Sequence, residues 1–376
     1  MDTDKKISYI TRNTEEVLTP SDLHNYISQG YRLKHYIGFE VSGKLHIGSG
    51  IMAGLKIADF QKAGVRCHCF LATWHAWINR KLSGDLSVIR SAAGYFTESL
   101  KASVSLCGGD PERVSFVRAD DLYHNNDLYW QTVIDIARRM TLKRALRSTT
   151  IMGRKESDVA DLASLFYTPM QVADIFIQDI SLAHSGIDQR KAHILAREVA
   201  SRMQVRPLLL DKRTPSKPLA VHHHLLLGLQ APPAWPVPAS NLSEALSEMK
   251  MSKSNPSSAV FIHDDPSLIH SKLRAAFCPE GVVSFNPILD WIKHLVFTSA
   301  RSSFNVSRPD KFGGDIVYES FLELESDFKR KQVHPLDLKT ALADYLSTFL
   351  EPARKHFQRP KMRKLREHID SLSVTR

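Results

Sequence analysis

The sequence lacks an apolar run of the roughly 20 residues that a membrane-spanning helix needs. Its first six residues, MDTDKK, are mostly polar or charged, so we expect no secretory signal at this end. Cysteine is scarce as well, with four in 376 residues and no CxxC pair. This composition argues against a disulfide framework, and a reducing, cytoplasmic location is the default expectation.

One short segment, Cys67-His68-Cys69, raises the question of a metal site. It lies in a run, 65–73, that predicts a strand. Because neighbouring side chains of a strand point to opposite faces, both thiols would lie on one side and the imidazole on the other. We therefore interpret the two cysteines as buried structural residues.

Positive charge is in excess, and the formal net charge is +10. Such a balance favours a polyanionic partner, although it also serves solubility. Residues 354–366 hold a cationic group without an acidic residue: Arg354, Lys355, Arg359, Lys361, Arg363, Lys364 and Arg366. A second group recurs every fourth residue, which predicts a cationic stripe on one helix face: Arg139, Lys143 and Arg147. A solvated face is the alternative for either group.

Strand-like and helix-like runs alternate through the first two-thirds of the chain, which predicts a parallel, doubly wound α/β sheet. The predicted strands are 32–39, 65–73, 114–117, 179–183, 207–210 and 221–226. The predicted helices are 49–63, 86–106, 127–147, 166–177 and 188–203. Beyond Asp265 the predictions are mostly helical: 266–277, 288–295, 318–331 and 336–357. We therefore expect two domains, 1–264 and 265–376.

The first candidate site is the segment 36–49, YIGFEVSGKLHIGS. A strand runs into a loop with glycines, and the loop opens a helix, which is where an open α/β sheet binds ligands. The free N–H groups and partial positive charge of a helix N-terminus suit phosphate. Gly43 and Gly48 allow close approach of the backbone, and His46 can donate to a phosphoryl oxygen. Alone, this pattern is common to many strand-to-helix turns.

The second candidate site is the segment 249–256, MKMSKSNP. It places Lys250 and Lys253 in a polar loop beyond the sheet. Lysines in such a loop can neutralise the charge that develops on a leaving pyrophosphate. Taken alone, the segment is an ordinary surface loop.

The third candidate site lies on the predicted helix 166–177. Tyr167, Gln171 and Asp174 fall on one face, at positions i, i+4 and i+7. The surrounding residues are largely apolar, so polar groups on this face need hydrogen-bond partners. A solvated face is the alternative interpretation.

Together, the first two segments resemble the HxGH and KMSKS signatures of class I aminoacyl-tRNA synthetases. The third segment narrows the resemblance to tyrosyl-tRNA synthetases of the archaeal and eukaryotic type, and the similarity extends from Tyr36 to the segment 334–339. It implies a Rossmann-like catalytic domain and a helical anticodon-binding domain. It also implies activation of tyrosine with ATP, transfer to tRNA(Tyr), Mg²⁺ that accompanies ATP without a dedicated metal site, a homodimer and a cytoplasmic location.

The resemblance also assigns roles to single residues. It implies that Tyr36 and Asp174 lie at the substrate's phenolic hydroxyl, and that its α-amino group is surrounded by Tyr167, Gln171 and Gln189. It implies catalytic roles for His46, Lys250 and Lys253. The ATP-binding set would be Gly38, Glu40, Gly48, Ser49, Met251, Ser252, Lys253 and Ser254. For tRNA it implies Arg147 and Arg190 at the acceptor stem, and His334 and Asp337 at the anticodon.

Four positions depart from the family pattern. Ser49 stands where the short signature has its second histidine, and Thr73 stands where aspartate is usual; Ser181 and Ser185 also differ. Two alternatives follow. A tryptophan enzyme is disfavoured by Asp174 and Tyr36, because indole has no para hydroxyl. A non-catalytic RNA-binding paralogue is disfavoured by the intact 250–254 segment.

Overall fold

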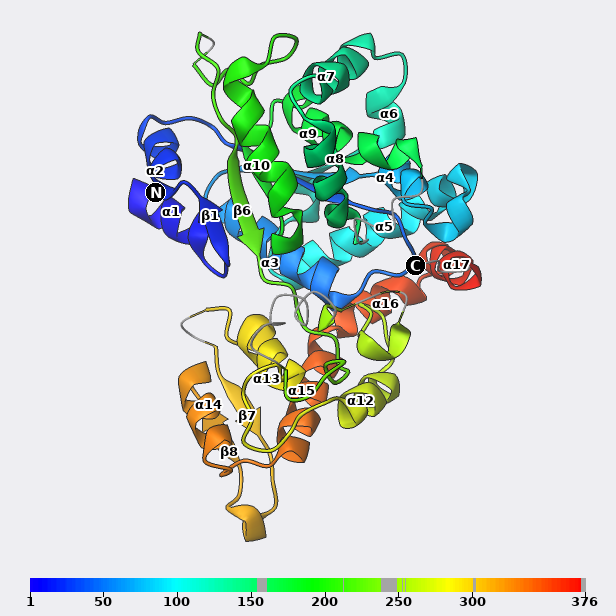
Figure 1. Cartoon of the computed structure of the whole chain (residues 1–376). Coiled ribbons are helices and arrows are strands. Elements are labelled where there is room, and N and C mark those ends of the chain that lie inside the picture. The colour runs from blue at the N-terminus through cyan, green and yellow to red at the C-terminus, as the bar shows by residue number, and fades with distance from the viewer. Residues whose placement is uncertain are drawn as a thin grey trace. The chain divides into compact units, whose positions relative to one another are not determined.

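The computed structural model describes residues 1–153, 161–211, 213–237, 249–251, 253, 255–299 and 302–372. The chain forms two compact units (Figure 1). Unit 1 comprises residues 1–43, 53–224 and 367–376, and unit 2 comprises 44–52 and 225–366. Within the described residues, no helix has both the length and the apolar character needed to cross a membrane.

A six-stranded sheet forms the centre of unit 1. Its strands are β1 (Glu16–Leu18), β2 (Lys34–Phe39), β3 (Arg66–Leu71), β4 (Val114–Arg118), β5 (Leu182–Gly186) and β6 (Leu219–His223). Their order is β1-β6-β5-β2-β3-β4. All neighbours are parallel except β1, which runs antiparallel to β6. This confirms the predicted α/β fold with a doubly wound, Rossmann-like sheet.

The α-helices of the first 224 residues connect these strands. They are α1 (Thr3–Thr11), α2 (Pro20–Ser28), α3 (Ile47–Lys62), α4 (Thr73–Ile78), α5 (Leu86–Leu106), α6 (Ala119–Tyr123), α7 (Asp127–Ala137), α8 (Leu142–Ser148), α9 (Tyr167–Ile177) and α10 (Arg190–Val199). The bounds of α5 agree with the predicted ones, because Asp85 caps its first turn by accepting from the N–H groups of Ser87 and Val88.

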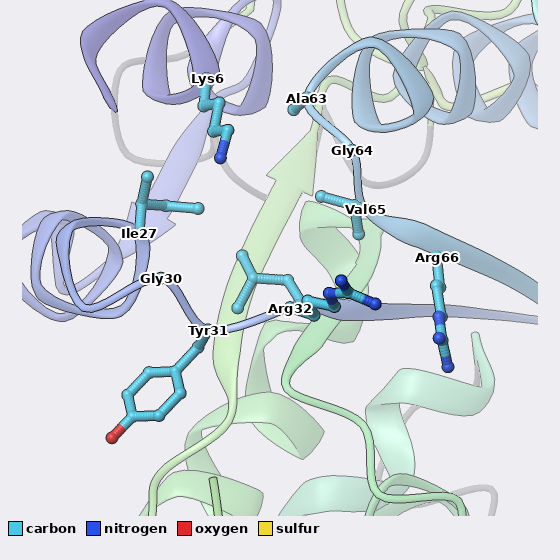
Figure 2. Close-up of a pocket in the computed structure, with 10 residues that line it drawn as sticks. Lys6, Ile27, Gly30, Tyr31, Arg32, Ala63, Gly64, Val65 and Arg66 are labelled. Atoms are coloured by element: carbon cyan, nitrogen blue, oxygen red, sulfur yellow. The ribbon is translucent and has the colours of Figure 1, made fainter. Parts of the chain in front are cut away.

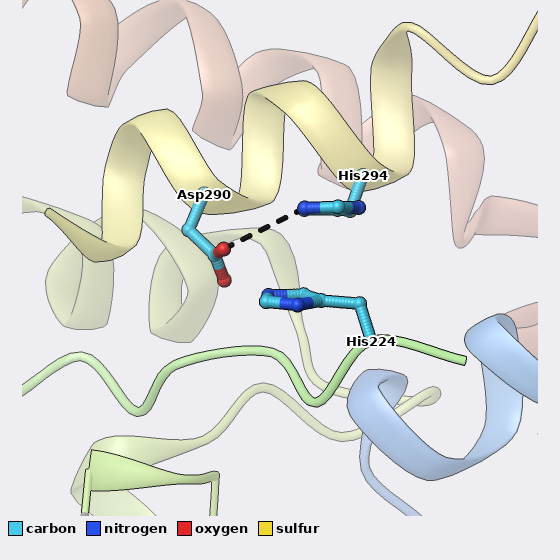
Figure 3. Close-up of side chains that lie close together, drawn as sticks. All are labelled: His224, Asp290 and His294. Carbon is cyan, nitrogen blue, oxygen red and sulfur yellow. Dashed lines mark ion pairs between the residues drawn. The ribbon is translucent and has the colours of Figure 1, made fainter. Parts of the chain in front are cut away.

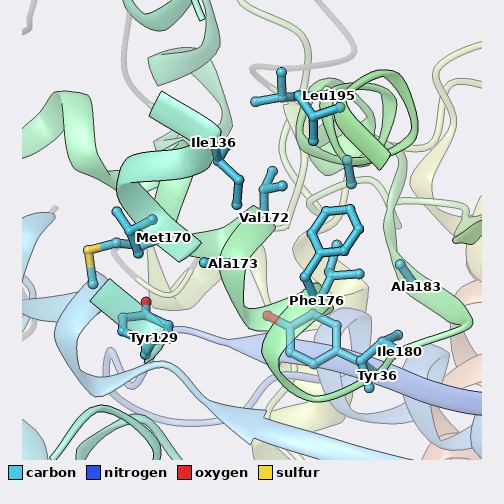
Figure 4. Close-up of a cluster of buried hydrophobic side chains, with 14 of the residues drawn as sticks. Tyr36, Tyr129, Ile136, Met170, Val172, Ala173, Phe176, Ile180, Ala183 and Leu195 are labelled. Carbon is cyan, nitrogen blue, oxygen red and sulfur yellow. The ribbon is translucent and has the colours of Figure 1, made fainter. Parts of the chain in front are cut away.

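Helices α7, α9 and α10 share one apolar cluster with the sheet (Figure 4). Tyr36 of β2 and Phe70 of β3 belong to it, as do Val172 and Phe176 of α9. Fully burying a large apolar side chain contributes about 1.5–3 kcal/mol. The cluster therefore holds α9, with its three polar residues, firmly against the sheet.

The prediction of a single helix over 127–147 is wrong, because the structure has two helices there. Helix α7 ends at Ala137 and α8 begins at Leu142, because the Thr141 side chain accepts from the N–H of Arg144 and starts a new helix. Arg139 lies in the connection and pairs with the buried carboxylate of Asp135 at 2.7 Å. The predicted stripe of Arg139, Lys143 and Arg147 is therefore not one helix face.

Two strand predictions also change. No strand forms over 207–210, and β5 begins three residues later than predicted, at Leu182.

The arrangement predicted for the cysteines is confirmed. Cys67 and Cys69 are buried, whereas His68 is on the more exposed face of β3. Burial raises the pKa of the Cys67 thiol to about 12, as expected of a structural cysteine.

Unit 2 is mostly helical. Its helices include α12 (Pro266–Ala275), α13 (Pro287–Trp291), α14 (Phe321–Lys329), α15 (Pro335–Phe349) and α16 (Glu351–Gln358); α17 (Pro360–Ser371) follows, and β7 (Phe304–Val306) pairs with β8 (Ile316–Tyr318). Asp290 of α13 accepts from the Leu227 N–H at 2.9 Å and lies 3.9 Å from His294 (Figure 3). The predicted helix 336–357 divides at Leu350. The predicted helix 318–331 begins later, at Phe321, because Tyr318 belongs to β8. Asp265 falls inside unit 2, and a functional boundary there stays a prediction.

Candidate active site

A buried carboxyl group on α9 is surrounded by hydroxyl groups. The Tyr123 hydroxyl donates to Oδ1 of Asp174 at 2.8 Å. Burial raises the pKa of Asp174 well above its usual range, against the opposing effect of the hydroxyl groups of Tyr123, Tyr129 and Tyr36. Its second oxygen, Oδ2, is buried without a hydrogen-bond partner among the described residues and lies 4.0 Å from Nε2 of His75. The Oδ2 atom can therefore form a hydrogen bond with one more polar group.

Tyr36 reaches this carboxyl group because of a glycine two residues further along β2. A Cβ atom at Gly38 would lie 2.7 Å from the Tyr36 hydroxyl oxygen, so any side chain there would displace the phenol ring. The ring packs against Phe70, with the centroids 5.7 Å apart. Gly38, predicted at the ATP, therefore has a visible steric role at the Asp174 site.

Sequence reasoning missed three residues of this site: Tyr123, Tyr129 and His75. The Tyr123 and Tyr129 rings stack with their centroids 4.0 Å apart, and they come from the end of α6 and the start of α7. The available signal was two tyrosines and Trp130 within eight residues. An aromatic group of this kind usually indicates a core, so it did not point to a polar site.

The other three polar predictions are Tyr167 and Gln171 of α9 and Gln189, which lies just before α10. The Tyr167 hydroxyl donates to Oε1 of Glu40 at 2.7 Å, and Asn79 donates to the same carboxylate at 2.9 Å. Gln171 donates to Oε1 of Gln189 at 3.3 Å. The carbonyl oxygen of Gln171 is buried and has no partner in the described chain. These residues thus combine the negative charge of Glu40 with a side-chain oxygen of Gln171 that has no partner among the described residues.

The departure at Thr73 has a compensating neighbour. The Thr73 hydroxyl donates to Asp120 at 2.8 Å, and Trp74 and Arg90 donate to the same carboxylate. Burial acts to raise the pKa of Asp120, but these hydrogen bonds outweigh it and lower the pKa. The Asp120 carboxylate therefore lies beside Thr73, the position where the family pattern has an aspartate. Ser181, by contrast, accepts from the Lys34 N–H at 2.7 Å.

In unit 2, the two signature segments lie against each other. The hydroxyl of Ser49 lies 3.2 Å from Nε2 of His46. A Cβ atom at Gly48 would lie 3.1 Å from Nδ1 of His46 and 3.3 Å from the sulfur of Met251. Burial, followed by the positive charges of Lys253 and Lys250, lowers the pKa of His46 to about 3. The structure thus brings His46 and Gly48 of the first segment near Lys250, Met251 and Lys253 of the second. Ser252 and Ser254 lie outside the described residues.

The residues predicted to contact tRNA occupy different settings. Arg147 is exposed near the end of α8. The guanidinium of Arg190 makes a paired contact with the Glu16 carboxylate, with N–O distances of 2.7 and 2.8 Å. His334 caps α15 by accepting from the Leu336 N–H, and Pro335 is the first helical residue. Asp337 is in the first turn of the same helix.

Known proteins are similar to the chain along its whole length. Residues 28–351 match the family of class I tRNA synthetases for W and Y. A tyrosine–tRNA ligase of Thermococcus sibiricus is 52% identical and aligns over 100% of both chains; that of Pyrococcus furiosus is 52% identical over 96% of each.

Solved structures agree with this similarity. The tyrosyl-tRNA synthetase of Pyrococcus horikoshii, solved with L-tyrosine, has 50% identity and a TM-score of 0.95, and the match covers 99% of this chain and 100% of that one. A tryptophanyl-tRNA synthetase of Aeropyrum pernix shares the fold at 18% identity, with a TM-score of 0.63 over 94% of this chain and 84% of that one. The chain therefore belongs to the class I aminoacyl-tRNA synthetases, in their tyrosine–tRNA ligase family.

Proposed function

We propose that this chain activates tyrosine with ATP, forming tyrosyl-adenylate and pyrophosphate, and then transfers the tyrosyl group to the 3′ end of tRNA(Tyr). Membership of the tyrosine–tRNA ligase family supports this function. One observation of the site carries it: the buried Oδ2 atom of Asp174, which lies beside Tyr36 and His75, has no hydrogen-bond partner among the described residues.

This carboxyl group would recognise the phenolic hydroxyl of tyrosine. A buried acceptor without a partner costs about 1–3 kcal/mol, and a hydroxyl that donates to it removes that cost. Phenylalanine has no such group. A site built in this way discriminates between the two amino acids by roughly 10⁴–10⁵ without editing. Tyr36 would contribute a second hydroxyl at the same position.

We further propose that the α-amino group lies near Tyr167, Gln171 and Gln189. The side-chain amide oxygen of Gln171, which has no partner among the described residues, suits an ammonium donor. The Glu40 carboxylate, held by Tyr167, adds a favourable negative charge nearby. Gly38 and Glu40 were predicted to contact ATP, and this stays a prediction. In the structure Gly38 lies against Tyr36 and Glu40 accepts from Tyr167, and both tyrosines belong to the proposed tyrosine site.

For the chemical step, we propose that His46, Lys250 and Lys253 stabilise the charge that moves onto pyrophosphate. With its lowered pKa, His46 is neutral at physiological pH, so it would act as a hydrogen-bond donor while the lysines supply charge. ATP would also contact Gly48, Ser49, Met251, Ser252 and Ser254. The segments 44–52 and 249–255 contain no carboxylate. This composition does not fit a protein-held metal, so Mg²⁺ would arrive with ATP.

The partners follow from the same assignment. We propose that Arg147 and Arg190 approach the acceptor stem, which requires Arg190 to exchange its Glu16 partner for RNA. His334 and Asp337 would read the anticodon, with residues 1–264 as catalytic domain and 265–376 as anticodon-binding domain. We also propose a cytoplasmic homodimer. Exposed apolar side chains on α7 support a protein contact there: Leu128, Trp130 and Ile134.

Amino-acid-dependent exchange between ATP and pyrophosphate tests the proposal. Tyrosine should support exchange, and phenylalanine and tryptophan should not. Equal exchange with tryptophan would contradict the assignment of the pocket. Absence of exchange with every amino acid, together with retained tRNA binding, would favour the non-catalytic paralogue instead.

A further inference from the structure

Two adjoining cavities lie in unit 1 where strands β2, β3 and β4 begin. Their volumes are about 360 and 350 Å³. Both are lined by the segment 64–66, which connects α3 to β3. Open α/β sheets bind their substrates at the opposite, carboxyl ends of the strands. The paired cavities therefore form a feature that the proposed activity does not use.

Cationic side chains surround both cavities. Lys6, Arg32 and Arg66 line the first, and Lys34, Arg66 and Arg113 line the second. Figure 2 shows Lys6 pointing from α1 toward the segment that carries Arg32, while Arg66 lies apart from them on the neighbouring strand. Neither lining contains an aspartate or a glutamate. Arg66 belongs to the lining of both cavities.

Three of these cations have no partner within the described part of the chain. No hydrogen bond or ion pair to the guanidinium groups of Arg32, Arg66 or Arg113 occurs among the described residues. Other arginines of the same unit are paired, for example Arg12 with Asp59 and Arg206 with Asp179. Positive charge therefore accumulates at the cavities.

The neighbouring titratable groups experience this field. Burial, followed by the charges of Lys34 and Arg66, lowers the pKa of His68 in the second cavity to about 4. The ammonium of Lys34 donates to the Gln178 carbonyl oxygen at 2.6 Å. Burial lowers its pKa; Asp179 opposes this effect, and Arg66 adds to it. An anion bound here would relieve the repulsion among the cations.

The backbone leaves the first cavity open. Gly30 and Gly64 line it with φ angles of +77° and +80°, a conformation that glycine adopts without strain. No atom lies within 4 Å of a Cβ built at either position. A ligand could therefore approach the main chain at Gly30 and at Gly64.

We propose that the paired cavities bind a compact ligand with two or more phosphate groups, either a nucleoside polyphosphate or an inorganic polyphosphate. The planar guanidinium of arginine binds phosphate through paired hydrogen bonds, and three arginines lie around two connected spaces. The cations line two compact, partly open spaces of about 360 and 350 Å³. This arrangement favours a compact anion over an RNA strand, whose backbone needs a continuous cationic track.

Hydrogen–deuterium exchange of the full chain, followed by mass spectrometry, tests the proposal. The probes are tripolyphosphate, ATP and a single-stranded oligonucleotide, each added separately. Tripolyphosphate should slow exchange in peptides that cover 27–34 and 61–68. Peptides that cover 249–255 report any binding at the proposed catalytic loop separately.

Two arginine variants complete the test. Arg66→Gln should weaken tripolyphosphate binding by roughly 10- to 100-fold, the effect of losing a charge-assisted hydrogen bond. Arg202→Gln is the matched control, because Arg202 is an exposed arginine that lines neither cavity. Tyrosine-dependent exchange between ATP and pyrophosphate should stay at the wild-type level in both variants. This result would show that both variants fold.

Each outcome decides the matter. Protection by tripolyphosphate and ATP alike assigns binding to the phosphate groups, and protection by ATP alone adds the nucleoside to what is recognised. The proposal is overturned if neither small ligand protects, if only the oligonucleotide protects, or if Arg66→Gln and Arg202→Gln behave alike.

Discussion

The Oδ2 atom of Asp174 lies 4.0 Å from the Nε2 atom of His75, and neither atom has a hydrogen-bond partner among the described residues. Both side chains are buried. A hydroxyl oxygen about 2.8 Å from each atom would satisfy both at once. The pair is therefore suited to recognise one hydroxyl group, which is the chemical difference between tyrosine and phenylalanine.

The first prediction concerns this pair. Asp174→Ala should lower kcat/KM for tyrosine by about 10- to 150-fold, the effect of losing one hydrogen bond to a charged group. The value for phenylalanine should change little, because phenylalanine makes no such bond. The measurement is kcat/KM for both amino acids in each protein. An unchanged ratio would show that Asp174 does not face the substrate hydroxyl.

The second prediction concerns the contact between the signature segments. Gly48→Ala would place a methyl group 3.1 Å from His46 and 3.3 Å from Met251. It should slow tyrosyl-adenylate formation by roughly 10-fold or more while tyrosine affinity is unchanged, because it displaces groups that act on ATP. Single-turnover kinetics and equilibrium binding of tyrosine separate the two effects. A parallel loss of tyrosine affinity would indicate a general disturbance of the structure.

The third prediction concerns charge on the loop after Met249. Lys253→Ala should slow adenylate formation by roughly 10²–10³-fold, as expected for the loss of one preorganised electrostatic group. Tyrosine binding should be nearly unaffected. Lys5→Ala, a change of an exposed lysine of α1, serves as the control for net charge. If tyrosine affinity falls as much as the rate, the loop has a structural role instead.

The fourth prediction concerns acid stability. Burial lowers the pKa of His75 and His223 to about 4, whereas an unfolded histidine titrates near 6.5. Between these values the unfolded chain binds more protons, so the free energy of unfolding should fall as pH drops from about 6.5 toward 4. The loss is roughly 2 kcal/mol per histidine at pH 5.

Urea denaturation at pH 7.5 and pH 5 measures this loss. His223→Gln should reduce the difference between the two pH values, whatever its effect on stability at pH 7.5. His24→Gln, at the exposed surface of α2, should leave the difference unchanged. Equal pH dependence in His223→Gln and the wild type would contradict the assignment.

The fifth prediction concerns tRNA. His334→Asn keeps a side chain that can cap α15 but removes the imidazole, whereas His334→Ala removes both. Both variants should weaken aminoacylation of tRNA and leave tyrosine-dependent pyrophosphate exchange intact. If only His334→Ala is impaired, the residue acts through the helix cap and not through RNA.

Patterns within a few turns of chain were predictable from the sequence alone. The bounds of α5 follow from its apolar period and its Asp85 cap, and the shared face of Tyr167, Gln171 and Asp174 follows from helix geometry. The alternation of strands and helices determined the α/β class in the same way. The break at Thr141 was missed, because the apolar period continues through it while one side-chain hydrogen bond starts a new helix.

Partners far apart in sequence were decided only by the tertiary structure. Tyr123 meets Asp174 across 51 residues, and Arg190 meets Glu16 across 174. Helix periodicity shows that Asp174 needs a partner but not which residue supplies it. Packing of α6, α7 and α9 made that choice, because only a closed core brings hydroxyl groups from separate segments to one carboxyl group.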